Sequence, residues 1–267
     1  STRCLEATVM FALLLAGCSP SFLVSPARYS SPQAAVQPRR ALVSCHGGMA
    51  EAAKATGFVQ TEMRGAAMKL HTRDQSREGE QKAQTPVAQW EPGRADYLRF
   101  LVDSRVVYQC FETLVEEYEE LAQYRSHGLE RGAALDADIA WFAEQGLETP
   151  AVGSYGTDYV ALLRELVAEG RWEAFTCHFY NFYFAHTAGG RMIGKRMADK
   201  LLDGRTLEFY QWGGAEPKEE LLPDLRDKID AVAETWSREQ KDACLEQTAN
   251  SFRYGGGMLG YLKAPQA

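Results

Sequence analysis

Apolar residues recur every three or four positions along most of the chain after residue 57, a spacing that gathers them on one face of an α-helix. In the first such stretch, residues 58–75, the shared face consists of Val59, Met63, Ala66, Ala67 and Leu70. The same period predicts helices at residues 97–121, 129–145, 158–168, 171–202, 219–236 and 237–261. We find neither the alternation typical of strands nor an internal repeat, so the pattern predicts one all-α domain of seven or eight helices.

Glycine and proline separate these periodic stretches. Pro150, Gly170 and Gly204 interrupt them, and residues 149–156 have the composition of a loop. Thr157 and Asp158, which follow that loop, are residue types suited to the N-terminal end of a helix. We therefore expect them to cap the helix after the loop.

The first fifty residues have a different character. Residues 7–50 contain no Asp or Glu and are rich in Ser, Ala, Pro and Arg, a composition that forms no packed core. Their apolar run, residues 7–17, rises about 16 Å as a helix, whereas the hydrocarbon core of a membrane needs about 30 Å. We interpret residues 1–52 as a disordered signal or transit presequence and residues 53–267 as one folded helical domain, with no membrane span in the mature chain.

Two kinds of address fit this presequence. The run that ends in Leu15-Ala-Gly-Cys18 has the form of a bacterial lipoprotein cleavage site, at which Cys18 is lipidated. Alternatively, the apolar run is followed by an Arg-rich, acid-free stretch through Arg40, which is similar to the bipartite presequence of proteins imported into algal plastids of secondary origin. The second interpretation is favoured and predicts the plastid stroma. The first residue is not Met, so we expect the true start to lie upstream.

Charge divides the chain at the same point. The whole sequence has 29 basic and 36 acidic residues, a net charge of −7, which argues against a nucleic-acid binder. Residues 1–50 hold four arginines and one glutamate, so the rest of the chain has a net charge of about −10.

The predicted mature chain has three cysteines, Cys110, Cys177 and Cys244. They are an odd, widely spaced set without a CxxC pair, and we expect buried, inert thiols in a reducing compartment.

The first candidate for chemistry is His71, at the edge of the apolar face of residues 58–75. A lone His in that position is ordinarily structural or exposed to solvent. However, Ala66 and Ala67 leave room for a planar ligand one turn earlier, and Gln75 at i+4 is positioned to accept from the second ring nitrogen and fix the tautomer. Arg64 lies about 10 Å along the same face, roughly the distance from the metal of a macrocycle to its acidic edge. Together these residues favour a metal-ligand role for His71.

The second candidate is Gly189-Gly190, inside a helical stretch that follows an aromatic run from Tyr180. Each Gly in a helix costs about 1 kcal/mol relative to Ala, so the pair requires an explanation. One explanation is a helix break at a close helix crossing. The other is a backbone that approaches a flat ligand and leaves space for a diatomic molecule. His186, one turn earlier, would then reach the same site, and a haem iron between the two helices satisfies both observations.

Extended motifs resemble the plastid haem oxygenases of plants and algae over about residues 57–262. They include Met63-Arg-Gly-Ala-Ala-Met-Lys-Leu-His71 and Cys177-His-Phe-Tyr-Asn-Phe-Tyr-Phe-Ala-His-Thr-Ala-Gly-Gly-Arg-Met-Ile-Gly194, with further matches at residues 90–104, 128–131 and 141–146. The resemblance implies a single all-α domain with haem between a proximal and a glycine-kinked distal helix. It also implies that haem b, substrate and cofactor at once, is cleaved with O₂ and reduced ferredoxin to biliverdin IXα, CO and ferrous iron for bilin chromophore synthesis.

The resemblance also assigns site residues. His71 matches the axial ligand of the haem iron, and Gly189 and Gly190 match the distal glycines. Haem propionate contacts match Arg64, Tyr180 and Arg226, and a pocket-wall aromatic matches Phe252. His186 replaces an Asp of the animal and bacterial branch and is shared with the plant and algal branch, which implies that it organises the water that delivers a proton.

Two alternatives to an active enzyme remain. A non-cleaving haem carrier or sensor of the same fold would have His186 as a second iron ligand, which closes the site to O₂. A catalytically dead relative usually lacks the proximal histidine, and the presence of His71 argues against it.

A basic stripe follows the distal glycines and consists of Arg191, Lys195, Arg196 and Lys200. On an acidic domain it would attract an acidic redox protein such as ferredoxin. The alternative is an ordinary solvated helix face. We expect the protein to be a monomer.

Overall fold

The computed structural model describes residues 57–263, so the predicted presequence and the Cys18 alternative lie outside the described residues. Within them every regular element is a helix, and the only extended pairing is an isolated bridge between Thr72 and Gln81. The all-α prediction is therefore confirmed. No helix in this part of the chain is both long and apolar enough to cross a membrane.

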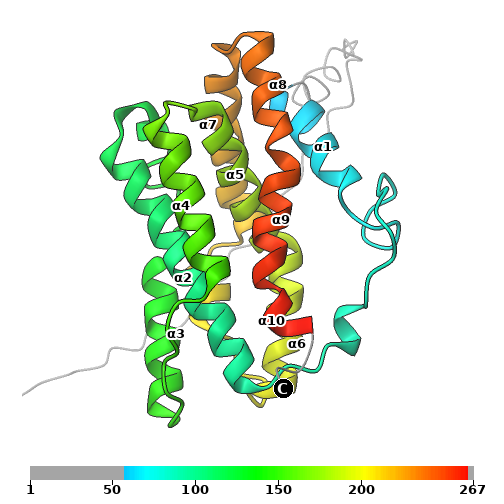
Figure 1. Cartoon of the computed structure of the whole chain (residues 1–267), viewed down its shortest axis with the longest axis vertical. Helices are drawn as coiled ribbons and strands as arrows, with labels where there is room; N and C mark the ends of the chain where they lie inside the picture. The colour runs from blue at the N-terminus through cyan, green and yellow to red at the C-terminus, as the bar shows by residue number, and fades with distance from the viewer. Residues whose placement is uncertain (1–56, 264–267) are drawn as a thin grey trace, which may run out of the picture. The chain divides into compact units, whose positions relative to one another are not determined.

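The long helix α2 (Arg94–Glu117) is central, and α3 (Gly132–Glu144) and α4 (Ser154–Ala168) pack along it. Figure 1 shows these three helices side by side. A continuous helical segment follows and consists of α5 (Trp172–Ala185), the π-helical turn η4 (His186–Gly190) and α6 (Arg191–Leu201). The C-terminal part comprises α7 (Leu222–Glu234), α8 (Arg238–Glu246), α9 (Thr248–Met258) and α10 (Gly260–Lys263).

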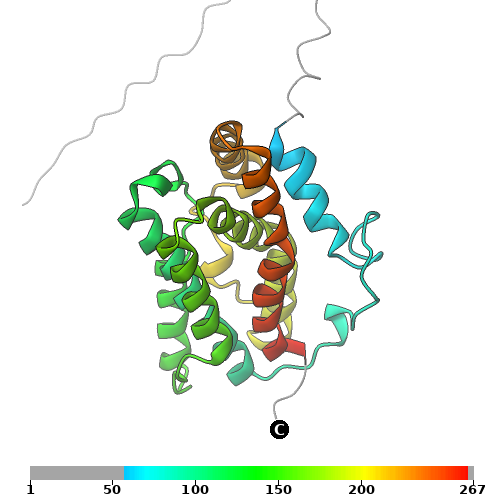
Figure 2. The same ribbon diagram turned by 45° about the horizontal axis from the view of Figure 1, so that its top comes forward.

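Short turns complete the described part of the chain. The π-helical turn η1 (Val59–Met63) runs directly into α1 (Arg64–Lys69). The others are η2 (Val87–Gln89), η3 (Glu119–Tyr124), η5 (Glu208–Tyr210) and η6 (Pro217–Leu221). In both ribbon views α1 lies apart from α2, α3 and α4 (Figures 1 and 2).

Aromatic side chains dominate the core. Phe111 on α2 is fully buried and contacts Tyr159 on α4 and Phe175 and Phe179 on α5, with ring centroids 5.5–6.1 Å apart. Edge-on aromatic contacts of this kind add to the large apolar area that each ring buries. The three cysteines of the described residues are free and buried as expected, and burial raises the pKa of Cys110 to about 11.

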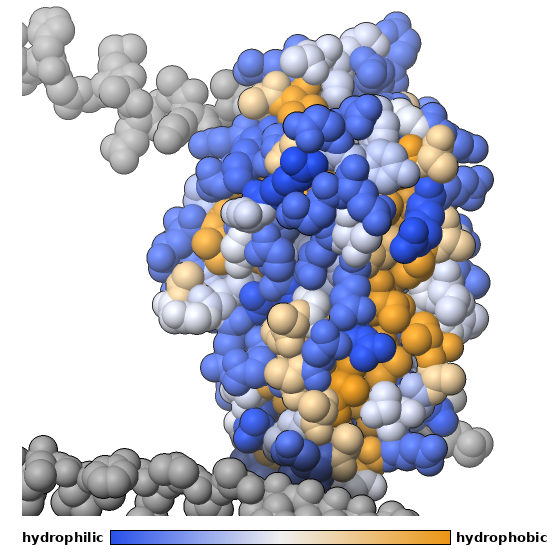
Figure 3. All heavy atoms as spheres, turned by 90° about the vertical axis from the view of Figure 1, so that its left-hand side faces the viewer, coloured by the Kyte–Doolittle hydropathy of each residue, from blue (hydrophilic) through white to orange (hydrophobic). Residues whose placement is uncertain are grey.

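The outer face over the left-hand side of Figure 1 is mostly hydrophilic, with its largest hydrophobic area toward the lower right of the view and smaller patches elsewhere (Figure 3). This face therefore follows the usual division between an apolar interior and a charged surface.

Buried carboxylates from neighbouring helices satisfy helix N-termini. Asp103 on α2 accepts from the amides of Gly153 (2.7 Å) and Gly156 (2.9 Å), where α4 begins. The first amides of a helix have no partner within it, so the carboxylate replaces a local cap. The expected cap at Thr157 and Asp158 is therefore wrong, because α4 begins at Ser154, one turn earlier.

Three more acids act in the same way. Glu112 accepts from the amides of Arg131 (2.7 Å) and Gly132 (2.9 Å) at the start of α3. Asp138 accepts from the two amides at the start of η5 (2.9 and 2.8 Å), and Asp230 from that of Val59 (2.8 Å). Long-range caps thus fix the relative positions of the helices.

Two predicted helices have different ends in the structure. The stretch predicted at residues 58–75 is helical only to Lys69, because residues 71–81 fold back into a tight turn in which the carbonyl of Thr72 accepts from the amides of Gln75 and Ser76. The stretch at 237–261 is divided into α8, α9 and α10. Gly170 and Gly204 end helices as predicted, with φ angles of +68° and +84° that favour glycine.

Candidate functional site

His71 lies just beyond the C-terminal end of α1, and a backbone carbonyl orients its ring. Its Nδ1 donates to the carbonyl oxygen of Ala67 at 2.9 Å. Because a carbonyl only accepts, Nδ1 carries the hydrogen and Nε2 keeps its lone pair. No described residue forms a hydrogen bond with Nε2. His71 is thus held in a single tautomer with one nitrogen available to a metal.

The surroundings of His71 restrict its movement. Its own amide donates to the carbonyl of Met68 (3.2 Å), and its carbonyl accepts from the amide of Gln81 (3.1 Å). The edge of its ring faces Phe252 on α9, with centroids 5.3 Å apart at 82°. The imidazole is therefore fixed by backbone contacts and by one aromatic wall.

Gln75 does not make the hydrogen bond to His71 that the sequence suggested. Its Oε1 accepts from the amide of Thr72 at 3.0 Å instead. Because the helix ends at Lys69, residue 75 no longer lies one turn above residue 71. The tautomer of His71 is therefore fixed by the carbonyl of Ala67 and not, as predicted, by Gln75.

The two distal glycines have different surroundings. Both belong to η4, a π-helical turn inserted into the continuous helix between α5 and α6, and such turns are frequent at functional sites. A Cβ on Gly189 would meet no atom within 4 Å, so this position borders open space. A Cβ on Gly190 would lie 2.9 Å from Nδ1 of His186. Gly189 therefore leaves room for a ligand, whereas Gly190 leaves room for a side chain of the protein.

His186 points into the core. Its ring is stacked on Phe209, with centroids 4.0 Å apart, and its Nε2 is bonded to the carbonyl of the same residue at 2.8 Å. Burial lowers the pKa of His186 to about 3, so the imidazole is neutral at physiological pH. His186 thus packs against η5, and a backbone carbonyl engages its Nε2. Because Nε2 is engaged, the second iron ligand that the haem-carrier alternative requires would have to be Nδ1, which faces Gly190.

Three residues with a potential role in anion binding lie near one another. Burial raises the pKa of Tyr180 to about 12, while the positive charges of Arg226 and Arg64 oppose this rise. The guanidinium of Arg226 lies 5.7 Å from the ring of Phe184, and its Nε is buried with no partner among the described residues. Arg64 is half-exposed and lies 3.8 Å from Glu78. Two cations and a phenol thus form a positive edge suited to carboxylates.

The basic stripe is divided between surface and internal contacts. Arg191 pairs with Glu216 at 3.0 Å, and Lys195 pairs with Asp199 at 3.3 Å within α6. Arg196 instead donates to the carbonyl of Ala88 (3.0 Å), and Lys200 donates to that of Trp90 (2.9 Å). Half of the stripe therefore binds the segment between α1 and α2.

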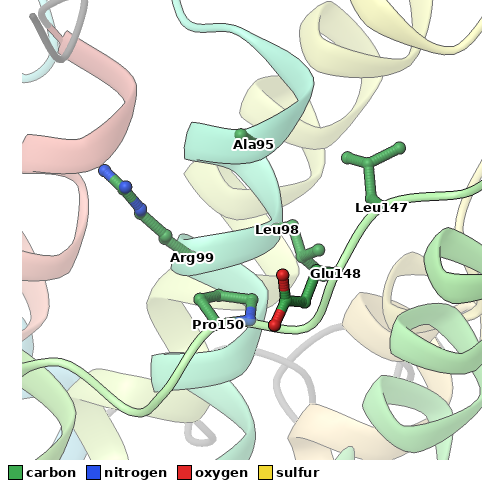
Figure 4. A pocket seen from close by; sticks show the side chains of 6 residues that line it. All are labelled: Ala95, Leu98, Arg99, Leu147, Glu148 and Pro150. Carbon is green, nitrogen blue, oxygen red and sulfur yellow. The ribbon is translucent and has the colours of Figure 1, made fainter.

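One cavity lies next to the candidate site, and another lies elsewhere in the described part of the chain. The larger, about 250 Å³, is bounded by Thr72, which follows His71 in the chain, by Gln75 and Trp90, by Ile193 of α6 and by Lys263. The smaller, about 160 Å³, lies between α2 and the loop after α3 and contains no candidate site residue. Figure 4 shows the residues that line it, with the side chain of Arg99 extended away from Glu148. Of these two, the larger cavity adjoins the candidate site.

The sequence did not reveal the roles of the backbone carbonyls of Ala67 and Phe209, which bind His71 and His186. It also did not reveal Asp138, which accepts from the amides of η5, where Phe209 lies. A carbonyl acceptor has no residue type of its own, so no side-chain pattern indicates it.

Known proteins are similar to this chain over most of its length. The family model described as "Heme oxygenase" matches residues 59–259. The chain is 48% identical over 209 residues to "Heme oxygenase 1, chloroplastic" of Arabidopsis thaliana, covering 76% of this chain and 73% of the relative. It is 49% identical over 208 residues to the protein of the same name from Oryza sativa subsp. japonica, covering 77% and 71%. A "Probable inactive heme oxygenase 2, chloroplastic" of Arabidopsis thaliana is 37% identical over 172 residues, covering 64% and 56%.

Solved structures share the fold. Heme oxygenase-2 from Synechocystis sp. PCC 6803, in complex with heme and NO, superposes with a TM-score of 0.58 at 15% identity, covering 78% of this chain and 85% of that one. Heme oxygenase-1 from the same cyanobacterium, in complex with heme, gives a TM-score of 0.54 at 18% identity, covering 63% and 77%. At these identities the likeness concerns the helical fold alone.

Proposed function

Because the chain belongs to the haem oxygenase family, we propose that it cleaves haem with O₂ and electrons to biliverdin IXα, CO and ferrous iron. The observation that supports this most strongly is the oriented imidazole of His71. Its Nδ1 is bonded to Ala67 and its Nε2 is available, as an axial ligand to haem iron requires.

The described residues fit haem as the ligand. His71 offers one neutral nitrogen, Phe252 offers an aromatic wall, and Gly189 borders open space. Arg226 has a buried Nε without a partner, next to Tyr180, as an anionic group of the ligand would require. This combination of a single metal ligand, apolar walls and a positive edge suits a porphyrin with two carboxylates.

Each of these residues has its own task. Bound haem supplies the iron that activates O₂ and the ring carbon that is oxidised. His71 would hold the haem iron through Nε2. The hydrogen bond from its Nδ1 to Ala67 keeps Nε2 unprotonated and the imidazole correctly oriented. Arg226, Tyr180 and Arg64 bind the propionates and so fix the rotation of the ring, which determines the carbon that is cleaved. Gly189 lets the distal backbone approach the ring without a side chain in the way.

His186 has a positioning task in this proposal. Its neutral ring is bonded to Phe209 and fills the space that Gly190 leaves, which holds the η4 turn against the core. His186 therefore supports the distal η4 turn from the core side and makes no contact with iron.

The plant relatives are named chloroplastic, which supports a plastid location. We place the protein in the stroma, delivered there by the presequence of residues 1–52, with reduced ferredoxin as the electron donor and biliverdin as precursor of bilin chromophores. Arg191 and Lys195 are the members of the basic stripe that make no contact with the segment between α1 and α2, and an acidic donor protein would meet them at the surface of α6.

A turnover assay tests the activity. Purified protein with one equivalent of haem is mixed with ferredoxin, its reductase and NADPH under O₂. We expect the Soret band to disappear while biliverdin absorbance grows, and pigment analysis to give the IXα isomer. A Soret band that persists through repeated reduction would favour the haem-carrier alternative.

His71→Ala tests the ligand assignment. Turnover should fall at least a hundredfold and recover when imidazole is added, because the free base takes the vacated position. Gln75→Ala is the matched control: it removes a polar side chain four residues away that has no contact with the ring, and its turnover should stay within about twofold of the parent. Full activity of His71→Ala without imidazole would show that another residue is the ligand.

A further inference from the structure

The segment from residue 70 to residue 93, called the strap below, connects α1 to α2 and carries His71 near its start. In Figures 1 and 2 it loops out on one side of the bundle before it returns to α2. Its only helical part is η2, and its only buried residues are Thr72, Gly79, Trp90 and Pro92. Little apolar surface therefore holds the strap in place, which is typical of segments that open locally.

Two side chains of α6 attach the strap to the distal helix. The Nη2 atom of Arg196 donates to the carbonyl oxygen of Ala88 at 3.0 Å. The Nζ atom of Lys200 donates to that of Trp90 at 2.9 Å and also forms an ion pair with Glu91. The segment that carries the proximal histidine is thus tied to the helix that follows the distal glycines.

The attached part of the strap covers the larger cavity. Trp90 is buried, its Nε1 donates to the carbonyl of Thr85 at 3.0 Å, and the ammonium of Lys263 lies 5.8 Å from its ring. The cavity beneath adjoins Thr72, next to His71, and Ile193, four residues after Gly189. Release of the strap would therefore open this cavity beside the haem site.

We propose that Arg196 and Lys200 form a latch that holds the strap closed over one edge of the tetrapyrrole site, and that its opening lets haem enter and the product leave. The proposal rests on the proposed function only in identifying the ligand as a tetrapyrrole. The latch itself is a property of the chain without ligand. Arg196 and Lys200 lie at i and i+4 and so share one face of α6, whereas Lys195 lies on a different face.

Limited proteolysis of the haem-free protein tests the latch directly. Arg73, Arg77 and Lys82 are exposed in the strap and are sites for trypsin. In the double variant Arg196→Gln with Lys200→Met, cleavage after these residues should be about tenfold faster, because both charged hydrogen bonds are lost. Lys195→Met is the matched control: its ammonium contacts only Asp199 on its own helix, and strap cleavage should not change. Each single variant should give an intermediate rate and keep the thermal unfolding midpoint of the parent.

Haem transfer tests the role of the latch. Protein loaded with haem is mixed with excess apomyoglobin, and the rate of haem loss is followed by absorbance. We expect about fivefold faster release from the double variant and no change for Lys195→Met.

An unchanged rate of strap cleavage would overturn the latch. Faster cleavage with unchanged haem release would show that the strap does not control access. Failure of every variant, and of the parent, to bind haem would refute the proposed function, while the proteolysis would still decide whether the latch exists.

Discussion

Backbone carbonyl oxygens fix both histidines that the sequence proposed for the haem site. The carbonyl of Ala67 binds Nδ1 of His71, whereas that of Phe209 binds Nε2 of His186. The first contact leaves Nε2 free to act as a ligand, and the second keeps a neutral ring inside the core. Two residues of the same type thus have different tasks because of the nitrogen that each carbonyl binds.

The two distal glycines provide a test at the same scale. Gly189→Ala should weaken haem binding and leave the free energy of unfolding unchanged or higher by up to about 1 kcal/mol, because its methyl group enters open space in a helix. Gly190→Ala should lower the free energy of unfolding by about 1–2 kcal/mol, because its Cβ would press on the ring of His186. Urea unfolding and haem titration of both variants measure these effects. Equal losses of stability would contradict the distinction.

Helix ends depend on residues far away in the sequence. Periodicity predicted the centres of α2, α3 and α4, because the apolar spacing that buries a face is local. It misplaced the start of α4, because the carboxylate that satisfies its first amides comes from Asp103, 50 residues earlier. Periodicity also predicted that α1 extends beyond His71. It missed the turn of residues 71–81, because backbone hydrogen bonds build this turn and no side-chain pattern indicates them.

Asp103→Ala tests the importance of these long-range caps. The carboxylate accepts from two amides of α4 and from the hydroxyl of Tyr261 (3.2 Å), so its loss should lower the free energy of unfolding by about 3 kcal/mol. Asp136→Ala is the control, because that exposed acid only pairs with Arg105 and Gln109 at the surface and should cost less than about 1 kcal/mol. Urea denaturation measures both. A loss for Asp103→Ala no larger than that of the control would show that water replaces the cap.

For the whole molecule, the sequence was sufficient for the fold class and for the family, because both depend on patterns spread over two hundred residues. It was not sufficient for the path of residues 70–93 or for the direction of His186. Both depend on contacts between distant elements, such as Lys200 with Trp90 and Asp138 with η5. The sequence therefore proposed a set of site residues, whereas their hydrogen bonds, such as that of His71 to Ala67, follow only from the structure.

Acid should destabilise the whole domain. Burial lowers the pKa of His127 and of His178 to about 4 and that of His186 to about 3, from an ordinary value of 6.5. Below pH 6.5 these histidines bind protons in the unfolded chain but not in the folded chain. The free energy of unfolding therefore falls as the pH falls, by about 1.4 kcal/mol per pH unit for each histidine. Asp138 opposes this trend, because burial raises its pKa to about 6 and the folded carboxyl binds a proton more readily than the unfolded one.

Urea unfolding between pH 7 and pH 5 measures this dependence. Three histidines outweigh one carboxyl, so the free energy of unfolding should decrease across this range. His178→Gln, which keeps a polar group next to Tyr159 and Gln247, should reduce the slope by about 1.4 kcal/mol per pH unit. A slope identical to that of the parent would mean that His178 binds a proton without unfolding.

The π-helical turn at His186–Gly190 holds one residue more than an α-helical turn along the same path, because its hydrogen bonds join residue i to residue i+5. Deletion of one residue from this turn would let it close into an ordinary α-helical turn, with α6 still continuous with α5. The widened backbone at Gly189 and Gly190 would then be lost. Insertion of a further residue has no such relief, because each residue of an α-helix advances the direction of its side chain by about 100°, and it would rotate Arg196 and Lys200 away from the strap. We therefore expect a one-residue insertion here to damage the latch more than a one-residue deletion.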